Sequence, residues 1–197
     1  NFGNANLKNV IFEDAGIGKT IQISMKEKSD CFDDDHVINL IKGFDCVGKV
    51  IDEEEIRTKF TNADLTNSKF GTTVLDEMQV ITFTDFSYAD LTNSDITNVR
   101  FMGCDFQDTT IDNITLDNVY FTKANLNDVQ GKSFDFNVVL LHDSSLINAK
   151  LTNGQIEMFV LKNSDLSNTD FTGTNIITMA QIQKNNLSCK NNDICEN

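Results

Sequence analysis

The chain has 197 residues, of which 30 are acidic and 16 basic, and its formal net charge is −14. A surface this acidic disfavours direct binding to nucleic acid or to anionic membranes, because both need basic protein surfaces. Hydrophobic residues make up 40% of the chain, and no apolar run reaches the roughly 18 residues of a transmembrane helix. There is no proline, so Asn, Asp, Gly, Ser and Thr must form the turns.

The N-terminal residues 1–17 place an apolar residue at every fifth position, at Phe2, Leu7, Phe12 and Ile17. Neither a helix, with a period of 3.6, nor a strand, with a period of 2, explains a period of five. A five-residue unit with two inward positions cannot bury its own apolar pair, so it must stack on copies of itself. We therefore expect residues 1–17 to form the first repeat coil of an all-β solenoid.

Residues 18–58 break this period. Three Asp precede residues 36–43, which predict a short helix that Gly43 can end, and residues 52–56 can begin another. We expect either an excursion that protrudes from an early coil or an N-terminal cap over the first coil. The candidate partner-binding residues of this segment are its apolar ones: Phe32, Val37, Ile38, Leu40, Ile41 and Phe44.

The period of five returns over residues 59–178. It runs first through Phe60, Leu65, Phe70, Leu75 and Val80, and we expect one extra residue within 81–85 to shift the frame. From Phe86 to Ile176, 18 of 19 fifth positions are apolar, whereas a 40% hydrophobic composition supplies about eight by chance. The predicted structural core comprises Leu65, Phe86, Leu91, Ile96, Phe101, Phe106, Leu116, Phe121, Leu126, Leu146, Leu166 and Phe171.

The volumes of the small inward residues indicate how many units form one coil. Two positions before the apolar residues, a column spaced by 20 reads Ser94, Ile114, Phe134, Gly154 and Thr174, so the oversized Phe is followed by the only Gly. Residues 20 apart would lie above one another if four units make a turn, with the roughly 4.8 Å spacing of β-strands between coils. The 28 units of the chain then predict about seven four-sided coils.

The C-terminal residues 179–197 lose the period again. Met179, Ile182 and Leu187 have the spacing of a short amphipathic helix, which would form a C-terminal cap or a dimer surface. With the segments above, this gives one structural domain with a possible route to a homodimer or a larger complex through its cap.

The repeat resembles the pentapeptide-repeat family, in which Ala is followed by Asp or Asn, then by Leu or Phe, and then by two variable polar residues. The motifs that carry the resemblance are Ala5-Asn6-Leu7, Ala63-Asp64-Leu65, Ala89-Asp90-Leu91, Ala124-Asn125-Leu126, Ser164-Asp165-Leu166 and Thr169-Asp170-Phe171. The resemblance covers residues 1–17 and 59–178. It implies a right-handed quadrilateral β-helix.

The five cysteines fall into three places. Cys104 occupies a small inward position, where a free thiol behaves as a small apolar residue. Cys31 and Cys46 lie in the 18–58 segment, and Cys189 and Cys195 lie in the tail, so these four are candidates for two local disulfides. Oxidised pairs would indicate an exported, periplasmic or organelle-lumen protein, whereas four reduced thiols would indicate a cytoplasmic one.

The sequence contains no pattern that indicates catalysis, a cofactor or a metal site. His36 and His142 lie outside any catalytic or metal-ligand spacing, and His142 follows an inward Leu, so we expect it to point to solvent. The acidic run at residues 30–35 lacks the Gly and the terminal Glu of a calcium loop. We expect Asp64, Asp90 and the other repeat carboxylates to form turns.

These features favour a non-catalytic scaffold that binds another protein, in an exported or lumenal compartment. Within the resembled family, some quinolone-resistance proteins mimic B-form DNA and bind DNA gyrase, and the charge of −9 over residues 59–178 suits that alternative. A secreted effector or a toxin accessory module is a further alternative. We expect a protein partner of unknown identity, no direct nucleic-acid partner and no membrane insertion.

Overall fold

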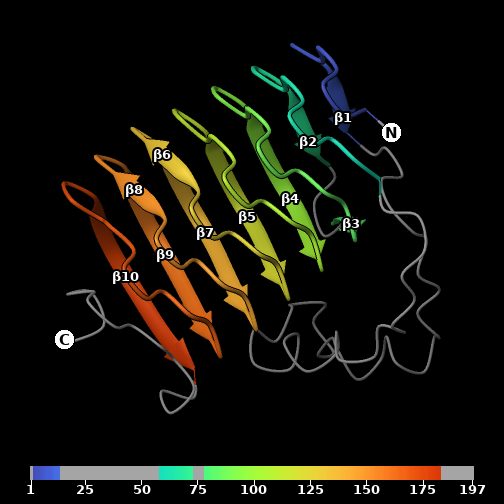
Figure 1. Cartoon of the computed structure of the whole chain (residues 1–197). Coiled ribbons are helices and arrows are strands. Elements are labelled where there is room, and N and C mark those ends of the chain that lie inside the picture. Colours follow the sequence, from blue (N-terminus) through green and yellow to red (C-terminus); the bar gives the residue numbers. More distant parts are fainter. Residues whose placement is uncertain (1, 14–57, 73–77, 183–197) are drawn as a thin grey trace, which may run out of the picture.

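The protein is a parallel β-solenoid, seen here in a computed structural model that describes residues 2–13, 58–72 and 78–182. The chain winds in repeated coils, so that segments about 20 residues apart lie side by side (Figure 1). Its strands are β1 (Ile11–Glu13), β2 (Lys69–Gly71), β3 (Gln79–Thr82), β4 (Asp95–Met102), β5 (Thr115–Thr122), β6 (Gln130–Lys132), β7 (Asp135–His142), β8 (Lys150–Thr152), β9 (Gln155–Lys162) and β10 (Asn175–Ile182). The predicted all-β solenoid is confirmed.

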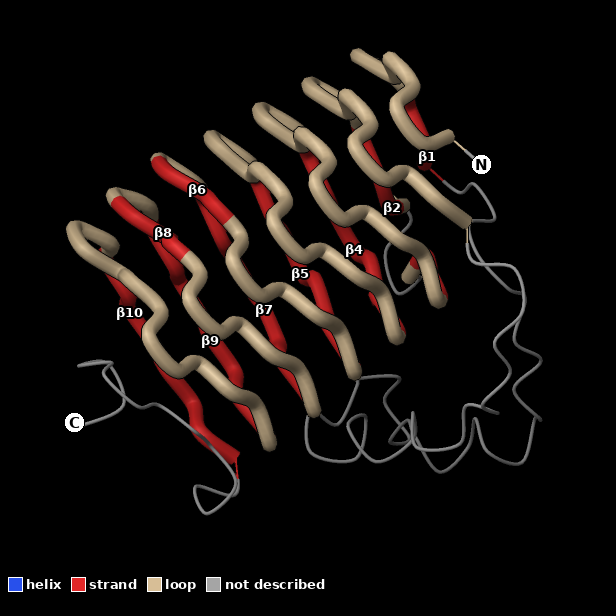
Figure 2. Tube along the Cα trace, viewed as in Figure 1, coloured by secondary structure: helices blue, strands red, loops and turns tan. Residues whose placement is uncertain are grey.

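Four parallel ladders of backbone hydrogen bonds hold each coil to the next, one ladder for each five-residue unit. One long sheet joins β1, β2, β4, β5, β7, β9 and β10 in that order, and β3 also pairs with β4. The other sides are formed by turns, short bridges and the two-stranded sheet of β6 and β8 (Figure 2). The bridges continue the same spacing, as in Asp105 to Asn125 and Thr110 to Gln130. Residues 14–57 and 73–77 lie outside the described residues, so the total of about seven coils stays a prediction.

The inside of the coil is a continuous column of apolar side chains. Every residue of the predicted core is buried except Phe171, which is partly buried and packs against the core from the last coils. Aromatic rings stack directly between coils: the ring centroids of Phe60 and Phe86 are 5.1 Å apart, and those of Phe86 and Phe106 are 4.8 Å apart. Each coil therefore closes the apolar surface that its neighbour leaves open.

Asn and Asp make the corners. Asn is the commonest residue with a positive φ, as at Asn93 (59°), Asn113 (53°) and Asn118 (55°), because its short polar side chain tolerates the left-handed region. The amide of Asn113 also donates to the side-chain oxygen of Asn93 at 3.2 Å, across the 20-residue spacing. The Asp residues before the inward apolar positions bind the next turn: Asp165 accepts a hydrogen bond from the Ser167 N–H at 2.9 Å. The prediction that these carboxylates form turns is confirmed for Asp165.

The frame predicted around Val80 is wrong. Gly71 pairs with Thr97, 26 residues later, whereas Gln79 pairs with Val99, 20 residues later. Six extra residues therefore lie between Gly71 and Gln79, instead of one within 81–85. As a result Ile81 points inward and is fully buried, and Val80 is 43% exposed. Both residues are apolar, so the local pattern alone could not distinguish these two frames.

The C-terminal helix predicted from Met179 and Ile182 is also wrong, because both residues belong to β10. The open edge of β9 offers unpaired backbone groups, and β10 pairs with it in parallel from Asn175 to Ile182. These ladder bonds outweigh a helical spacing of three apolar residues. Leu187 and the rest of the tail, and the helices expected at residues 36–43 and 52–56, lie outside the described residues.

The 20-residue column of Phe134 and Gly154 is confirmed by their packing. A Cβ atom added to Gly154 would lie 2.5 Å from the ring of Phe134, and that ring is buried. Real Cβ contacts are not this short, so the missing side chain of Gly154 makes the space that the large ring of Phe134 occupies. The volumes therefore compensate between adjacent coils.

This packing predicts a strong coupling between the two positions. Gly154→Val should lower the free energy of unfolding by roughly 1–3 kcal/mol, because the ring of Phe134 cannot move away within a packed coil. Phe134→Val in the same chain should recover much of that loss. A double-mutant cycle measured by urea unfolding checks this coupling, and strictly additive effects would contradict the 20-residue column.

Candidate partner-binding surface

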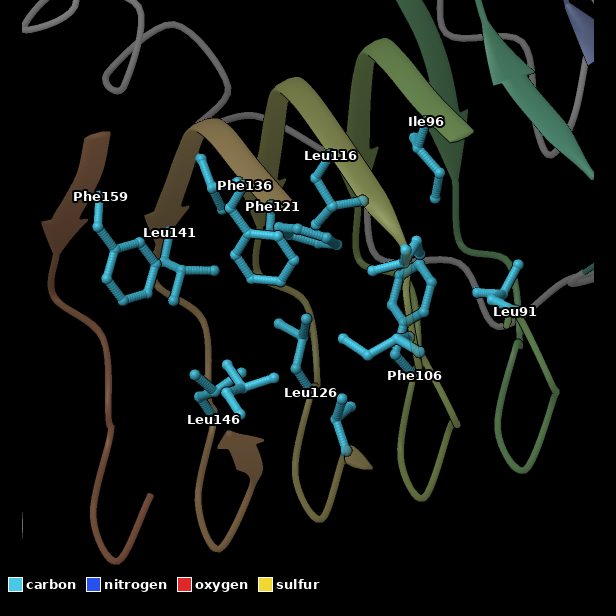
Figure 3. A pocket seen from close by; sticks show the side chains of 15 residues that line it. Leu91, Ile96, Phe106, Leu116, Phe121, Leu126, Phe136, Leu141, Leu146 and Phe159 are labelled. Carbon is cyan, nitrogen blue, oxygen red and sulfur yellow. The ribbon is translucent and has the colours of Figure 1, made fainter. Parts of the chain in front are cut away.

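The interior of the coil does not offer a ligand site. A cavity of about 40 Å³ lies between the coils and is lined only by apolar side chains, among them Leu116, Phe121 and Leu141 (Figure 3). Small-molecule sites usually have roughly 300–1,000 Å³ and a few polar groups that orient the ligand. This space is therefore a packing defect of the core, and a functional surface must lie on the outside of the solenoid.

Three of the four outer faces carry polar side chains at the position just before the inward apolar residue. The columns read Lys59, Asp85, Asp105, Asn125, Ser145, Asp165 on one face; Asn6, Asp64, Asp90, Thr110, Gln130, Lys150, Asp170 on the next; and Ile11, Lys69, Asp95, Thr115, Asp135, Gln155, Asn175 on the third, in which Ile11 is an apolar exception. Such side chains bind water and the turns, and they repeat with little change from coil to coil.

The fourth face differs. It is formed by β3 and by the C-terminal halves of β4, β5, β7, β9 and β10, and we call it the stripe face. The equivalent column on it reads Val80, Arg100, Tyr120, Leu140, Val160 and Ala180. Tyr120, Leu140 and Val160 form a hydrophobic cluster separate from the core, with Met78, Val138 and Met158 packed against it. We call these six residues the outer apolar stripe.

The central residues of the stripe are buried although the register places them outside the coil. The exposed fractions of Tyr120, Leu140 and Val160 are 8%, 3% and 2%. Their neighbours at the inward positions, such as Phe121 and Leu141, belong to the core on the other side of the sheet. The sheet of the stripe face therefore separates two apolar layers, one inside the coil and one outside it.

Arg100 and Tyr120 form the polar end of the stripe. The guanidinium carbon of Arg100 lies 5.4 Å from the centre of the Tyr120 ring, a cation–π contact. Burial lowers the pKa of Arg100 from its ordinary value. Burial raises the pKa of Tyr120, and the positive charge of Arg100 opposes part of that rise. Tyr120 is therefore buried and Arg100 is partly buried beside it.

His142 and Lys162 lie beside the stripe, one position after the inward residues of β7 and β9. The expectation that His142 points to solvent is wrong, since its exposed fraction is 7%. Its Nε2 atom lies 3.5 Å from a carboxylate oxygen of Asp143. The register does direct His142 away from the core, but on the stripe face the outer side is itself buried. Lys162 is buried in the same way, at 5% exposure.

Both interruptions of the repeat begin at the edge of the stripe face. β1 ends at Glu13, which pairs with Gly71, and Gly71 pairs in turn with Thr97, just before the stripe face of its coil. After residues 14–57, the carbonyl of Thr58 accepts a hydrogen bond from the N–H of Asp85, at the start of the next face. In chain order, the positions that would form the stripe face of the first coil therefore fall within residues 14–57, outside the described residues. The six-residue insertion likewise precedes Gln79, the first residue of β3.

The sequence-based site candidates lie mostly elsewhere. The apolar residues proposed to bind a partner, from Phe32 to Phe44, are outside the described residues, and so are the four cysteines proposed to form disulfides. Cys104 is a buried free thiol that donates to the carbonyl of Ile81 at 3.4 Å. Within the described ranges no group of three His, Cys, Asp or Glu could hold a metal, and no helix is long and apolar enough to cross a membrane.

Sequence reasoning missed the outer apolar stripe, although a signal was present. The position before each inward residue is polar on three faces, yet on every fourth unit from Arg100 onward it becomes Arg, Tyr, Leu and Val. Residues 20 apart had to be compared to find this departure. Comparison within a run of consecutive units shows only an occasional apolar substitution.

A comparison with protein families matches residues 100–130 to the model described as Pentapeptide repeats (8 copies). These residues contain the units in which the 20-residue ladder was traced from Phe101 to Phe121. The repeat in this part of the chain is thus a pentapeptide repeat. No curated protein matches the chain.

Several solved structures are similar to this chain. Rfr23, a pentapeptide-repeat protein from the cyanobacterium Cyanothece 51142, is 14% identical with a TM-score of 0.41, over 66% of this chain and 90% of Rfr23. HetL, involved in heterocyst differentiation regulation in Nostoc sp. strain PCC 7120, is 13% identical with a TM-score of 0.23, over 62% and 82%. A trypsin-treated form of QnrB1, a plasmid-mediated fluoroquinolone resistance protein, is 15% identical with a TM-score of 0.24, over 61% and 86%.

The burial of Tyr120 predicts an unusual titration. In a Tyr88→Phe chain, where Tyr120 is the only tyrosine, its phenol should ionise above its ordinary pKa of about 10. Adding Arg100→Gln should raise the midpoint further, because the nearby positive charge favours the phenolate. Ultraviolet absorbance measures both midpoints. A midpoint equal to that of the urea-unfolded chain would contradict the burial of this ring.

Proposed function

We propose that this chain is a non-catalytic scaffold that acts by binding another protein, and that residues 18–57 carry the recognition. The outer apolar stripe is the observation that supports this most directly. The core inside the coil already holds the coils together, so stacking of the coils does not require a second apolar layer outside. Apolar side chains gathered on one outer face are typical of a surface that binds a polypeptide.

The gyrase-binding alternative receives less support from the described faces. A mimic of DNA needs negative charges repeated along the molecule, as phosphates are repeated along a duplex. The column that contains Asp85 and Asp105 begins with Lys59 and continues with the uncharged Asn125 and Ser145. The stripe face carries Arg100 and Lys162 in place of acidic residues. The net charge is thus not organised as a continuous acidic surface on these two faces.

The function is tested by deletion of the segment. Residues 18–57 are replaced by a short Gly-Ser turn, and an affinity-tagged chain is chemically crosslinked to its neighbours in the native source and analysed by mass spectrometry. The proposal predicts that the partner captured by the full chain is lost, while circular dichroism still shows the β-solenoid. A control chain with Thr92→Ala and Thr152→Ala on a polar face should keep the partner. Capture that survives the deletion would place recognition on the repeat faces and contradict the proposal.

We also propose that the protein works in an exported or lumenal compartment with two local disulfides, Cys31 to Cys46 and Cys189 to Cys195. Short polar loops with little core gain most from such a covalent link. Thiol titration of the denatured protein from its native source should then find one free thiol, that of Cys104. Five free thiols would contradict the disulfides and favour a cytoplasmic protein.

A further inference from the structure

We propose that residues 18–57 of this chain dock on its own outer apolar stripe, so that the solenoid presents this segment to the partner from one side. The inference goes beyond the proposed function, because recognition by the segment does not require that it bind the solenoid. It concerns where the segment is held, and it rests on the described stripe face, on the two points where the chain leaves and rejoins the coil, and on the sequence between them.

The segment is attached to the coil at the two edges of the stripe face. Glu13 and Thr58 lie at the two corners that bound the stripe face in the first coils. The segment therefore begins and ends on the same side of the solenoid as Tyr120, Leu140 and Val160. Each corner also bounds one polar face, but the stripe face is the one that lies between both attachment points.

The segment is long enough to cover the whole stripe. The stripe extends from Met78 to Val160, across about four coil spacings of roughly 4.8 Å, or about 20 Å in all. The 44 residues between 13 and 58 can span much more than this, even with two short helices, since a helix still advances about 1.5 Å per residue. The attachment points and the length of the segment are thus both compatible with docking along the whole stripe.

The sequence of the segment is chemically complementary to the stripe face. Val37, Leu40, Ile41 and Phe44 recur with the spacing i, i+3, i+4 and i+7, which gives a helix one apolar side suited to a flat apolar surface. The run at residues 30–35 just before them contains four Asp, and the stripe face carries Arg100 and Lys162. Apolar residues can meet the stripe while the acidic run approaches these two cations.

The central residues of the outer apolar stripe are buried. Leu140 and Val160 are nearly inaccessible although they point away from the core, and Arg100 is partly buried. Met78, Val138 and Met158 are the described residues that pack against the cluster, and they are themselves only partly buried. Residues 18–57 have the composition and the attachment points to cover this cluster.

Docking divides the segment between two roles. The side with Val37, Leu40, Ile41 and Phe44 would be buried against the solenoid, whereas Phe32 and Ile38 would remain available to a partner. A partner would therefore meet a surface formed by the segment and held rigidly by the stripe, which lowers the entropy cost of ordering the segment when the partner binds.

Hydrogen–deuterium exchange of the full chain tests this proposal. In the native protein, peptides from residues 30–45 should exchange at least tenfold more slowly than in a synthetic peptide of that sequence. Leu140→Asp should remove this protection, because it places a carboxylate in the middle of the stripe. Gln130→Asp makes the same change of charge at the equivalent exposed position of a polar face, and it should leave the protection unchanged.

Exchange in the core strands is measured in the same experiment and separates release of the segment from unfolding. If Leu140→Asp also speeds exchange in β5 and β7, the milder Leu140→Ser serves as the test. The proposal is overturned if residues 30–45 are unprotected in the native chain, or if neither stripe variant changes their protection. If the protection depends on protein concentration, a second copy of the chain covers the stripe instead. If the stripe variants remove protection only from residues 183–197, the tail covers it. Partner capture can fail or succeed independently of each of these results.

Discussion

The structure depends on one packing constraint, the stacking of inward apolar side chains at a spacing of 20 residues. A single coil has too little apolar surface to be stable alone, so each inward residue must contact its equivalents in the coils on either side. The stacked rings of Phe60, Phe86 and Phe106 show this contact, and the space left by Gly154 for Phe134 shows how closely it is fitted. The polar corners follow from the same constraint, because a coil with a period of five must turn sharply after every unit. Asn and Asp provide those turns without a Pro or a large number of Gly.

Much of this could be predicted from the sequence, since the period of five is local and is repeated many times. The inward positions from Phe86 to Leu166, the compensation between Phe134 and Gly154 and the turn role of Asp165 all follow from it. The frame around Val80 could not be predicted, because Val80 and Ile81 are both apolar and a six-residue insertion leaves the same remainder as a one-residue insertion. The end of the repeat was also misjudged, because pairing of β10 with the edge of β9 is a tertiary interaction that helical spacing does not report.

The stripe face shows why function was harder to predict than fold. Residues such as Tyr120 and Leu140 occupy positions that the repeat leaves free, so nothing in the period requires them to be apolar. Their meaning depends on three-dimensional placement. They align only when units four apart are superposed, and they lie on the face at whose edge both interruptions of the repeat begin. His142 was misjudged for the same reason, because an outward residue is exposed only where the outer face is exposed. Departures from a repeat are therefore informative in two ways, by residue type and by the face on which they accumulate.

The central functional claim is that the outer apolar stripe binds residues 18–57 of the same chain. Photo-crosslinking measures this contact most directly: a photoreactive amino acid replaces Leu140 in the full-length protein, which is irradiated at high dilution and analysed by mass spectrometry. The account predicts an intramolecular adduct within residues 18–57, and no such adduct when the same amino acid replaces Gln130. Adducts only with solvent, with residues 183–197 or with a second protein molecule would contradict it.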